Sequence, residues 1–186
     1  MRIYDATTDG WKAKDFHRCC DKKGPTLTIV ETTKDFIFGG FTTAEWESPD
    51  NPTPKPCPHT FLFSVNEGGK YPTEWESGDA ILCYSGYCAR FGEGGSELYV
   101  SEDSNINTDS NCEQSYNRCF RLPPFKKPGS LYSPSTINGG EESFQVKNFE
   151  VYSVTVRITT NIKFSYNERR TDGVRLIYKV IYFKKL

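Results

Sequence analysis

The stretch that decides the fold class is Thr26-Leu27-Thr28-Ile29-Val30, which is followed closely by Phe36-Ile37-Phe38-Gly39-Gly40. Its first half is β-branched and alternates in polarity, which is typical of a half-buried strand. Residues 32–35 are predicted to form a turn, and the aromatic second half is predicted to return and to end at the glycine pair. The stretch therefore predicts a β-hairpin.

Further short β segments follow this hairpin along the chain. We predict strands at residues 61–65, 80–84 and 97–100, and a longer strand at residues 144–152. Because the strands are separated by irregular loops and helices are few, the pattern favours a mainly β (α+β) fold. The predicted architecture is an antiparallel two-sheet β-sandwich flanked by a few short helices.

One helix is predicted before the hairpin. Thr8 or Asp9 can accept amide hydrogens of a first turn, so either can serve as the N-cap. Three residues then fall on one face at helical spacing: Ala13, Phe16 and Cys20. The Gly24-Pro25 pair is predicted to end the helix, because proline cannot continue it.

Three segments are predicted to be long loops. Residues 48–58 contain five prolines, which lack the amide hydrogen that a sheet needs, so an extended surface loop is predicted. A ligand for an SH3-type domain is the alternative interpretation. Residues 101–115 are rich in Ser, Asn and Asp, and residues 123–142 are rich in Pro, Gly and Ser.

Composition narrows the class of protein. The 186 residues fit one domain with a substantial core, and the formal net charge of -1 gives no global field that would attract nucleic acid. No apolar run approaches the roughly 20 residues of a membrane-spanning helix, and the first residues lack the apolar core of a secretion signal. We therefore expect a cytoplasmic protein whose seven cysteines are reduced.

Residues 155–186 differ in composition from the rest of the chain. Of the 23 basic and 24 acidic residues, eight basic and two acidic ones lie in this tail, which leaves 15 basic and 22 acidic residues in 1–154. Alternating apolar residues predict a β-hairpin in the tail. Binding to a membrane surface through its basic charge is a further alternative.

Four blocks resemble, in their order along the chain, the TLDc domain of eukaryotic oxidation-resistance proteins. They are Asp9-Gly10-Trp11 with Phe16-His17 and Cys20; residues 24–29 with Phe38-Gly39-Gly40-Phe41-Thr42 and Trp46; residues 91–100; and residues 144–152. The resemblance implies a TLDc domain at residues 1–154. Its opening is expected to be truncated, because relatives have more chain before the first block. Residues 155–186 are then a basic C-terminal extension.

The resemblance also implies a function. It implies a non-enzymatic interaction module linked to oxidative-stress protection, with the vacuolar proton pump as the expected protein partner. No cofactor, nucleic-acid partner or membrane insertion is expected, and the oligomeric state stays open. The residues predicted to bind the partner or to carry the family motif are Asp9, Gly10, Trp11, His17, Phe38, Gly39, Gly40, Trp46, Phe91, Gly92, Gly94 and Glu150.

No complete catalytic set is visible in the sequence. His17 with Asp9 or Asp15 is the minimum for a hydrolase, but the G-x-S-x-G nucleophile motif is absent. The chain has two histidines and no C-x-x-C spacing, so no metal site is predicted. Glutamates flank Trp46 and Trp75 as in a carbohydrate site, but a half-exposed strand or turn is the favoured interpretation.

Glu150 and the thiols carry the remaining expectations. Glu150 lies in an apolar strand and is predicted to be a structural clamp that must find hydrogen-bond donors.

Cys19 and Cys20 cannot both face the core, so one of these two thiols is predicted to be more exposed. Both lie near the C-terminal end of a helix, which does not lower a thiol pKa. A thiol-based redox enzyme or peroxide scavenger is nevertheless the alternative function.

Overall fold

The computed structural model describes residues 1–73, 79–92, 97–114, 119–120, 133–134, 136–141, 143–155, 162–164 and 181–183. The chain falls into two compact units, Met1–Val154 and Thr155–Leu186. Each is described by itself, and their assignment as a TLDc domain and an extension stays a prediction. The expectations for Trp75 and Gly94 lie outside the described residues.

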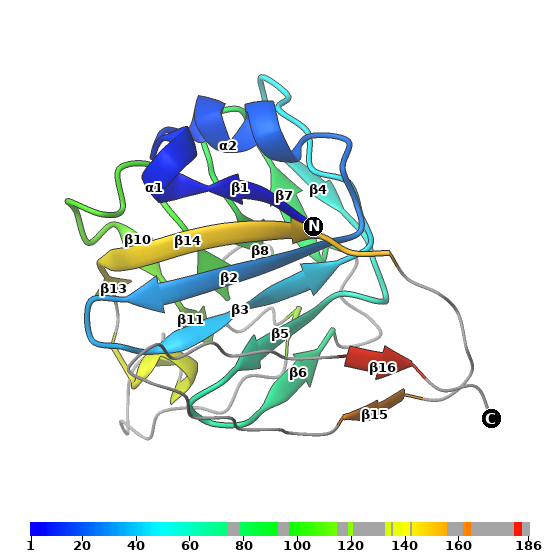
Figure 1. The fold of residues 1–186 in the computed structure, drawn as a ribbon, viewed down its shortest axis with the longest axis vertical. Helices are drawn as coiled ribbons and strands as arrows, with labels where there is room; N and C mark the ends of the chain where they lie inside the picture. Colours follow the sequence, from blue (N-terminus) through cyan, green and yellow to red (C-terminus); the bar gives the residue numbers. More distant parts are fainter. Residues whose placement is uncertain are drawn as a thin grey trace. The chain divides into compact units, whose positions relative to one another are not determined.

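The larger unit contains two six-stranded sheets in which every strand pair is antiparallel. The first sheet has the order β1 (Arg2–Asp5), β14 (Val146–Ser153), β2 (Thr26–Thr32), β3 (Ile37–Thr42), β5 (Phe61–Ser64) and β6 (Lys70–Pro72). The second has the order β13 (Ser143–Phe144), β10 (Ser110–Asn111), β9 (Leu98–Tyr99), β8 (Arg90–Phe91), β7 (Ile81–Cys83) and β4 (Thr53–Lys55). The sheets lie one behind the other, which confirms the predicted β-sandwich (Figure 1).

The smaller elements complete the description. Two helices, α1 (Ala6–Asp9) and α2 (Ala13–Cys20), lie over one end of the sandwich beside β1 (Figure 1). A two-stranded sheet joins β11 (Glu113–Gln114) to β12 (Ser133–Pro134), and a short 3-10 helix, η1, spans Thr136–Asn138. In the second unit β15 (Ile162–Phe164) pairs with β16 (Ile181–Phe183). The helices of the described residues are too short to cross a membrane.

Two helices replace the single predicted one. Asp5 caps α1 by accepting the Thr7 amide at 3.0 Å, and α2 begins after Lys12, so neither Thr8 nor Asp9 is an N-cap. Gly10 separates the helices with a φ of 112°, in the region that favours glycine. The apolar face is confirmed, because Ala13, Phe16 and Cys20 are all buried. The helix ends at Cys20, before the predicted Gly24-Pro25 stop.

The hairpin that decides the fold is present, but its second strand does not end at the glycine pair. Alternate residues of β2 are buried, but the buried residues are Thr26, Thr28, Val30 and Thr32, while the apolar Leu27 and Ile29 are only partly buried. β3 continues through Gly39 and Gly40 to Thr42. A Cβ atom on Gly39 would overlap the carbonyl oxygen of Thr28, and a Cβ atom on Gly40 would lie 2.5 Å from the ring of Phe91. The glycines therefore allow close packing within the sandwich.

This packing yields the first prediction. Substitution of Gly40 by alanine should lower the free energy of unfolding by about 1–3 kcal/mol, because the new methyl group meets the Phe91 ring. Urea denaturation followed by circular dichroism measures the change. Because the clash involves one ring, the same substitution should cost less in a Phe91→Leu background. An equal cost in both backgrounds would contradict the packing argument.

Three other expectations need correction. The proline-rich loop contains the edge strand β4, in which Pro54 lies opposite Leu82; proline is tolerated there because an edge strand leaves one side unpaired. The predicted loops at 101–115 and 123–142 contain the short strands β10, β11 and β12.

The predicted strand at residues 144–152 is split at Gln145, whose side-chain amide donates to the Asn105 carbonyl at 2.6 Å. The chain thus passes from the second sheet to the first at this residue.

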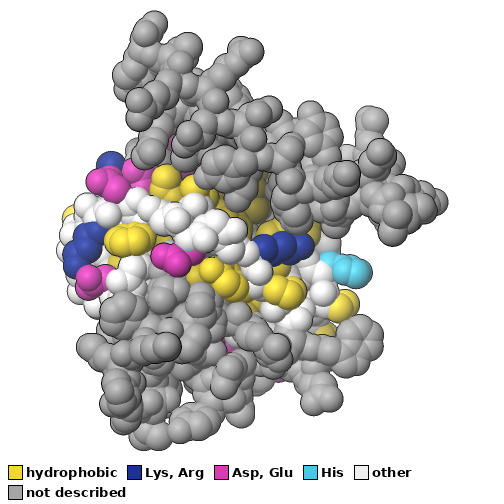
Figure 2. All heavy atoms as spheres, turned by 90° about the horizontal axis from the view of Figure 1, so that it is seen from below, with side chains coloured by type: hydrophobic (Ala, Val, Ile, Leu, Met, Phe, Trp, Pro, Cys, Tyr) yellow, Lys and Arg dark blue, Asp and Glu magenta, His cyan; other side chains and the backbone are white. Residues whose placement is uncertain are grey.

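The surface of the described residues is mixed in charge. On the face seen in Figure 2, apolar side chains lie among both acidic and basic ones. On this described part of the face, the two signs are interspersed, and Lys and Arg do not form a continuous basic stripe.

Candidate functional site

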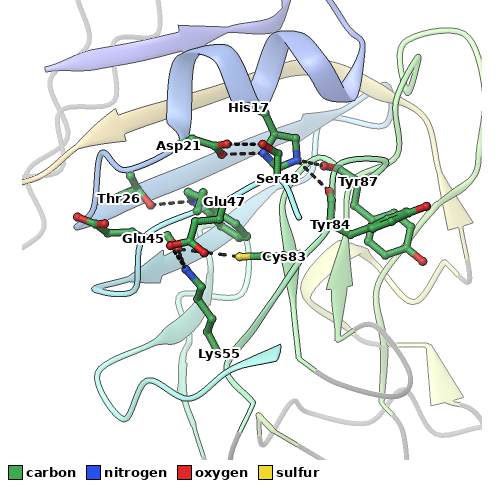
Figure 3. A network of polar contacts seen from close by, with 11 residues as sticks. His17, Asp21, Thr26, Glu45, Glu47, Ser48, Lys55, Cys83, Tyr84 and Tyr87 are labelled. Atoms are coloured by element: carbon green, nitrogen blue, oxygen red, sulfur yellow. Dashed lines mark hydrogen bonds and ion pairs between the residues drawn. The ribbon is translucent and has the colours of Figure 1, made fainter. Parts of the chain in front are cut away.

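A buried histidine network connects α2 to the turn between β7 and β8. The His17 side chain is only 6% exposed. Its Nδ1 lies 2.7 Å from Asp21 Oδ1, and its Nε2 lies 2.9 Å from the carbonyl oxygens of both Tyr84 and Tyr87 (Figure 3). Asp21 Oδ2 in turn accepts a hydrogen bond from Ser48 Oγ at 2.8 Å. The network thus joins segments that are far apart in the sequence.

The partners of His17 determine what its ring can do. Carbonyl oxygens only accept hydrogen bonds, so Nε2 must donate to Tyr84 and Tyr87 and has no lone pair free to take up a proton. Ser48 bonds to the far side of Asp21, whereas a hydrolytic triad needs the serine on the histidine. The predicted partners Asp9 and Asp15 are replaced by Asp21. The geometry fits a structural role, in which His17 holds the turn at residues 84–87 to α2; we call His17, Asp21 and this turn the His17 latch.

The Asp9-Gly10-Trp11 segment retains partly exposed surface. Asp9 Oδ2 accepts the Asp5 amide at 2.9 Å, and the Gly10 carbonyl accepts the Tyr4 hydroxyl at 2.9 Å. Trp11 packs partly against the core, while its carbonyl oxygen accepts the Asp103 amide at 2.8 Å. This motif therefore both connects the helical end to a loop and leaves side-chain surface for a partner.

The aromatic motif residues lie in the core. Phe38, Trp46 and Phe91 are 0% exposed, and Gly39 and Gly40 are buried beside them. The Trp46 ring contacts Phe91 with a centroid separation of 5.5 Å. These residues pack the sandwich and do not face solvent. Because Trp46 is buried, it cannot form the exposed floor of a carbohydrate site.

Glu97 is a buried carboxylate that the sequence analysis did not single out. Gly92 has a φ of 87°, and Glu97 Oε2 occupies the space that a side chain at position 92 would need. Glu97 Oε1 accepts the Cys119 amide at 2.7 Å, but Oε2 has no hydrogen-bond partner among the described residues. Burial raises the pKa of Glu97 to about 7. Gly92 therefore leaves room for the Glu97 carboxylate, and β9 begins directly after Glu97, where a phosphate loop would lead into a helix.

Glu150 forms the expected clamp on the first sheet. One carboxylate oxygen lies 2.6 Å from Arg2 Nη1, and the other accepts the Tyr152 hydroxyl at 2.9 Å. Arg2 also lies 3.0 Å from Asp5. The side chain of Glu150 is 17% exposed, so its charge is satisfied at the sheet surface. The unnamed donors of the sequence analysis are thus Arg2 and Tyr152.

The thiols differ in their environments. All seven cysteines are free, and Cys19 is more exposed than Cys20, as predicted. Burial raises the pKa of both thiols. Cys57 is the exception: burial acts to raise its pKa, but hydrogen bonds from the hydroxyls of Thr43 and Thr60 and from backbone amides outweigh burial and lower it to about 7. Its Sγ lies 2.9 Å from Thr43 Oγ1.

Metal ligands do not converge in the described residues. No group of three or more His, Cys, Asp or Glu side chains there could hold a metal ion.

Sequence reasoning found His17 and Glu150 but missed the partners of His17, the carboxylate of Glu97 and the environment of Cys57. The available signal for Glu97 was an acidic residue at the start of an otherwise apolar strand.

Comparison with known proteins adds evidence of relationship. The sequence model of the family described as the TLDc domain matches residues 1–155. MTOR-associated protein MEAK7 of Danio rerio is 45% identical over 47 residues, which are 25% of this chain and 10% of that protein. The matched segment therefore spans about a tenth of this curated relative.

Proposed function

This chain belongs to the TLDc domain family, and from this premise we propose that it is a non-enzymatic interaction module that acts by binding a protein partner. The observation that carries the proposal is the set of hydrogen bonds made by His17. Both of its nitrogens are engaged in a latch to Asp21 and to the turn at residues 84–87. The ionisable residue of the opening motif thus supports a scaffold that presents surface.

The expected partner is the vacuolar proton pump, and the expected context is cytoplasmic protection against oxidative stress. The partly exposed Asp9-Gly10-Trp11 segment offers one contact surface. The zebrafish relative is named for association with MTOR, so MTOR is a second partner to look for. Residues 155–186 are proposed as a basic extension of the TLDc domain.

Affinity purification tests the proposal. The full chain, carrying a tag, is expressed in eukaryotic cells with and without oxidant, and bound proteins are identified by mass spectrometry. Pump subunits should be enriched over a tag-only control. A Trp11→Ala variant should recover less pump if the Asp9-Gly10-Trp11 segment is the contact surface. Glu67→Gln is the surface control, because Glu67 is exposed in the turn between β5 and β6 of the first sheet. Recovery of neither pump subunits nor MTOR in any condition would refute the proposed partners.

A second candidate function, thiol-based peroxide chemistry, is favoured by Cys57. A thiolate at Cys57 would attack one peroxide oxygen and break the O–O bond, which gives sulfenic acid and a hydroxide that takes a proton from solvent to become water. Two thiols of an added reductant would then restore the Cys57 thiol, with release of water and of the disulfide of the reductant. The lowered pKa of about 7 provides the thiolate near neutral pH.

The pH dependence of Cys57 alkylation follows from this pKa. Iodoacetamide labelling, quantified by peptide mass spectrometry, should rise with a midpoint near pH 7 at Cys57, because only the thiolate reacts. At Cys19, whose pKa is raised, labelling should rise only above the ordinary pH range of thiols.

If Cys57 acts on peroxide, the peroxide consumed should exceed one equivalent per chain, and this consumption should vanish in Cys57→Ser but not in Cys19→Ser. Consumption that stops near one equivalent would leave the thiols as passive targets.

A further inference from the structure

The His17 ring faces hydrogen-bond acceptors on both of its edges. Its Nδ1 lies 2.7 Å from a carboxylate oxygen of Asp21, and its Nε2 lies 2.9 Å from the carbonyl oxygens of Tyr84 and Tyr87 (Figure 3). Carbonyl and carboxylate oxygens only accept hydrogen bonds. Each ring nitrogen must therefore carry a proton for these contacts to be attractive, and an imidazole ring with two protons is a cation.

The carboxyl group of Asp21 is placed to be the anion of this pair. The Ser48 hydroxyl donates to its second oxygen at 2.8 Å, and such donation favours a carboxylate over a carboxylic acid. The Asp21 side chain is also 22% exposed, and contact with water favours its charged form. The geometry thus places the shared proton on the ring, and His17 and Asp21 form an ion pair.

The other ionisable groups around the ring do not take over the role of Asp21. The thiols of Cys20 and Cys83 lie near Asp21, but burial raises the pKa of both, so they are neutral at neutral pH. The rings of Tyr84 and Tyr87 point away from the His17 latch in Figure 3. Charged side chains of the neighbouring segments pair with each other, Glu47 with Lys55 and Arg18 with Asp9.

Loss of one ring proton would weaken every bond of the His17 latch. If Nδ1 lost it, its lone pair would face the Asp21 carboxylate at 2.7 Å. The bonds from Nε2 to the two carbonyl oxygens would then come from a neutral ring, and hydrogen bonds from a neutral donor are about half as strong as those from a charged one. If Nε2 lost the proton instead, both bonds to the turn would be lost. Either loss loosens the connection between α2 and the turn at residues 84–87.

The turn has few other bonds to hold it among the described residues. Its tip, Ser85 and Gly86, is exposed. The Tyr87 amide donates to the Tyr84 carbonyl at 3.0 Å, and the Ser85 amide donates to the Pro49 carbonyl at 3.0 Å. A surface turn with so few internal bonds opens more often when one of its anchors weakens. The Tyr87 amide hydrogen therefore reports directly on the His17 latch.

We propose that the His17 latch is a proton-controlled device, in which the imidazolium ring holds the turn at residues 84–87 to α2 and loss of its proton, as pH rises, loosens the turn. The sign follows from the partners. A group whose protonated form gains acceptors in the folded state stabilises that state at low pH, and this stabilisation is lost as pH rises. The inference goes beyond the proposed function, because the device needs no partner. Since α2 follows the Asp9-Gly10-Trp11 segment, the device lies beside the proposed contact surface.

Nuclear magnetic resonance of the 186-residue chain tests the proposal. The chain has two histidines, and His59 is exposed, so His59 is an internal reference; a His59→Gln variant assigns the signals. At a pH at which the His59 ring has lost its second proton, the nitrogens of His17 should still give the signals of an imidazolium ring. A further rise of pH should remove these signals. Hydrogen exchange of the Tyr87 amide, corrected for its intrinsic pH dependence, should then accelerate about tenfold or more.

An Asp21→Asn variant separates a proton-controlled device from a merely structural one. Asparagine can donate its amide to the Nδ1 lone pair and accept the Ser48 hydroxyl at its oxygen. A neutral ring then satisfies all of its partners, with Nε2 still donating to the turn. In this variant His17 should lose its second proton together with His59, and the corrected Tyr87 exchange should stay constant. Asp50→Asn removes a carboxylate from an exposed residue and should behave like the wild type.

Each outcome decides the proposal. It is overturned if the His17 ring has one proton while His59 still carries two, if Tyr87 exchange ignores the deprotonation of His17, or if Asp21→Asn responds to pH like the wild type. Pump recovery in cells is a separate readout. Failure to recover pump subunits from a chain with the expected resonance behaviour refutes the pump as partner and leaves the proton-controlled latch standing; the reverse result refutes the latch alone.

Discussion

Substitution of Glu97 by glutamine is expected to increase the free energy of unfolding above pH 7 by about 3 kcal/mol. The Glu97 side chain is fully buried, and its Oε2 has no partner among the described residues. Burial raises its pKa from 4.5 to about 7, so between these pH values the folded state holds a proton that the unfolded state has lost, and above pH 7 the folded state holds a buried charge. Glutamine keeps the shape and remains neutral.

The sign of the pH dependence follows from this difference. Because the pKa of Glu97 is higher in the folded state, stability falls as pH rises from about 4.5 to about 7 and levels off above that. Urea denaturation at a series of pH values should show this slope in the wild type and a reduced slope in Glu97→Gln. Glu67→Gln, at an exposed glutamate, is the control that should keep it. Parallel curves for wild type and Glu97→Gln would disprove the argument.

Substitution of Trp46 by alanine is expected to lower the free energy of unfolding by about 3–5 kcal/mol, which is typical of deleting a fully buried aromatic ring. The Trp46 ring is 5.5 Å from Phe16 of α2 and 5.5 Å from Phe91 of the second sheet, and its Nε1 donates to Thr26 Oγ1 of the first sheet at 3.0 Å. One side chain thus joins three elements, and its loss leaves a cavity.

A conservative variant separates packing from hydrogen bonding at this position. Trp46→Phe keeps part of the aromatic contact but leaves the Thr26 hydroxyl without its donor, so its cost should lie between the wild type and Trp46→Ala. Chemical denaturation followed by far-ultraviolet circular dichroism measures all three proteins. If Trp46→Ala lost less than about 1 kcal/mol, the position of Trp46 at the centre of the core would be wrong.

Local alternation predicted the sandwich because it depends only on neighbouring residues. The alternation of residues 26–30 predicted the strand β2, but not which of its faces is buried, because Thr26 and Thr28 are buried and Leu27 and Ile29 are only partly so. The glycine pair was misinterpreted because its role depends on Phe91, more than fifty residues away. The split at Gln145 was missed for the same reason, since the bond that turns the chain comes from Asn105.

The site was less accessible from sequence than the fold. His17 could be identified as a motif residue, but the carbonyl groups that it holds belong to Tyr84 and Tyr87, and backbone groups carry no sequence signal. Cys57 was not singled out, because the hydroxyls that lower its pKa come from Thr43 and Thr60.

The place of β14 has a consequence for biosynthesis. This strand lies between β1 and β2, so β1 waits until nearly the last residues of Met1–Val154 have left the ribosome before it gains a hydrogen-bonded neighbour in the sheet. Until then β2 exposes an unpaired edge, which is open to aggregation. The first sheet should therefore form only once β14 is complete. A chaperone bound to the nascent chain should stay bound until residue 153 has emerged from the ribosome.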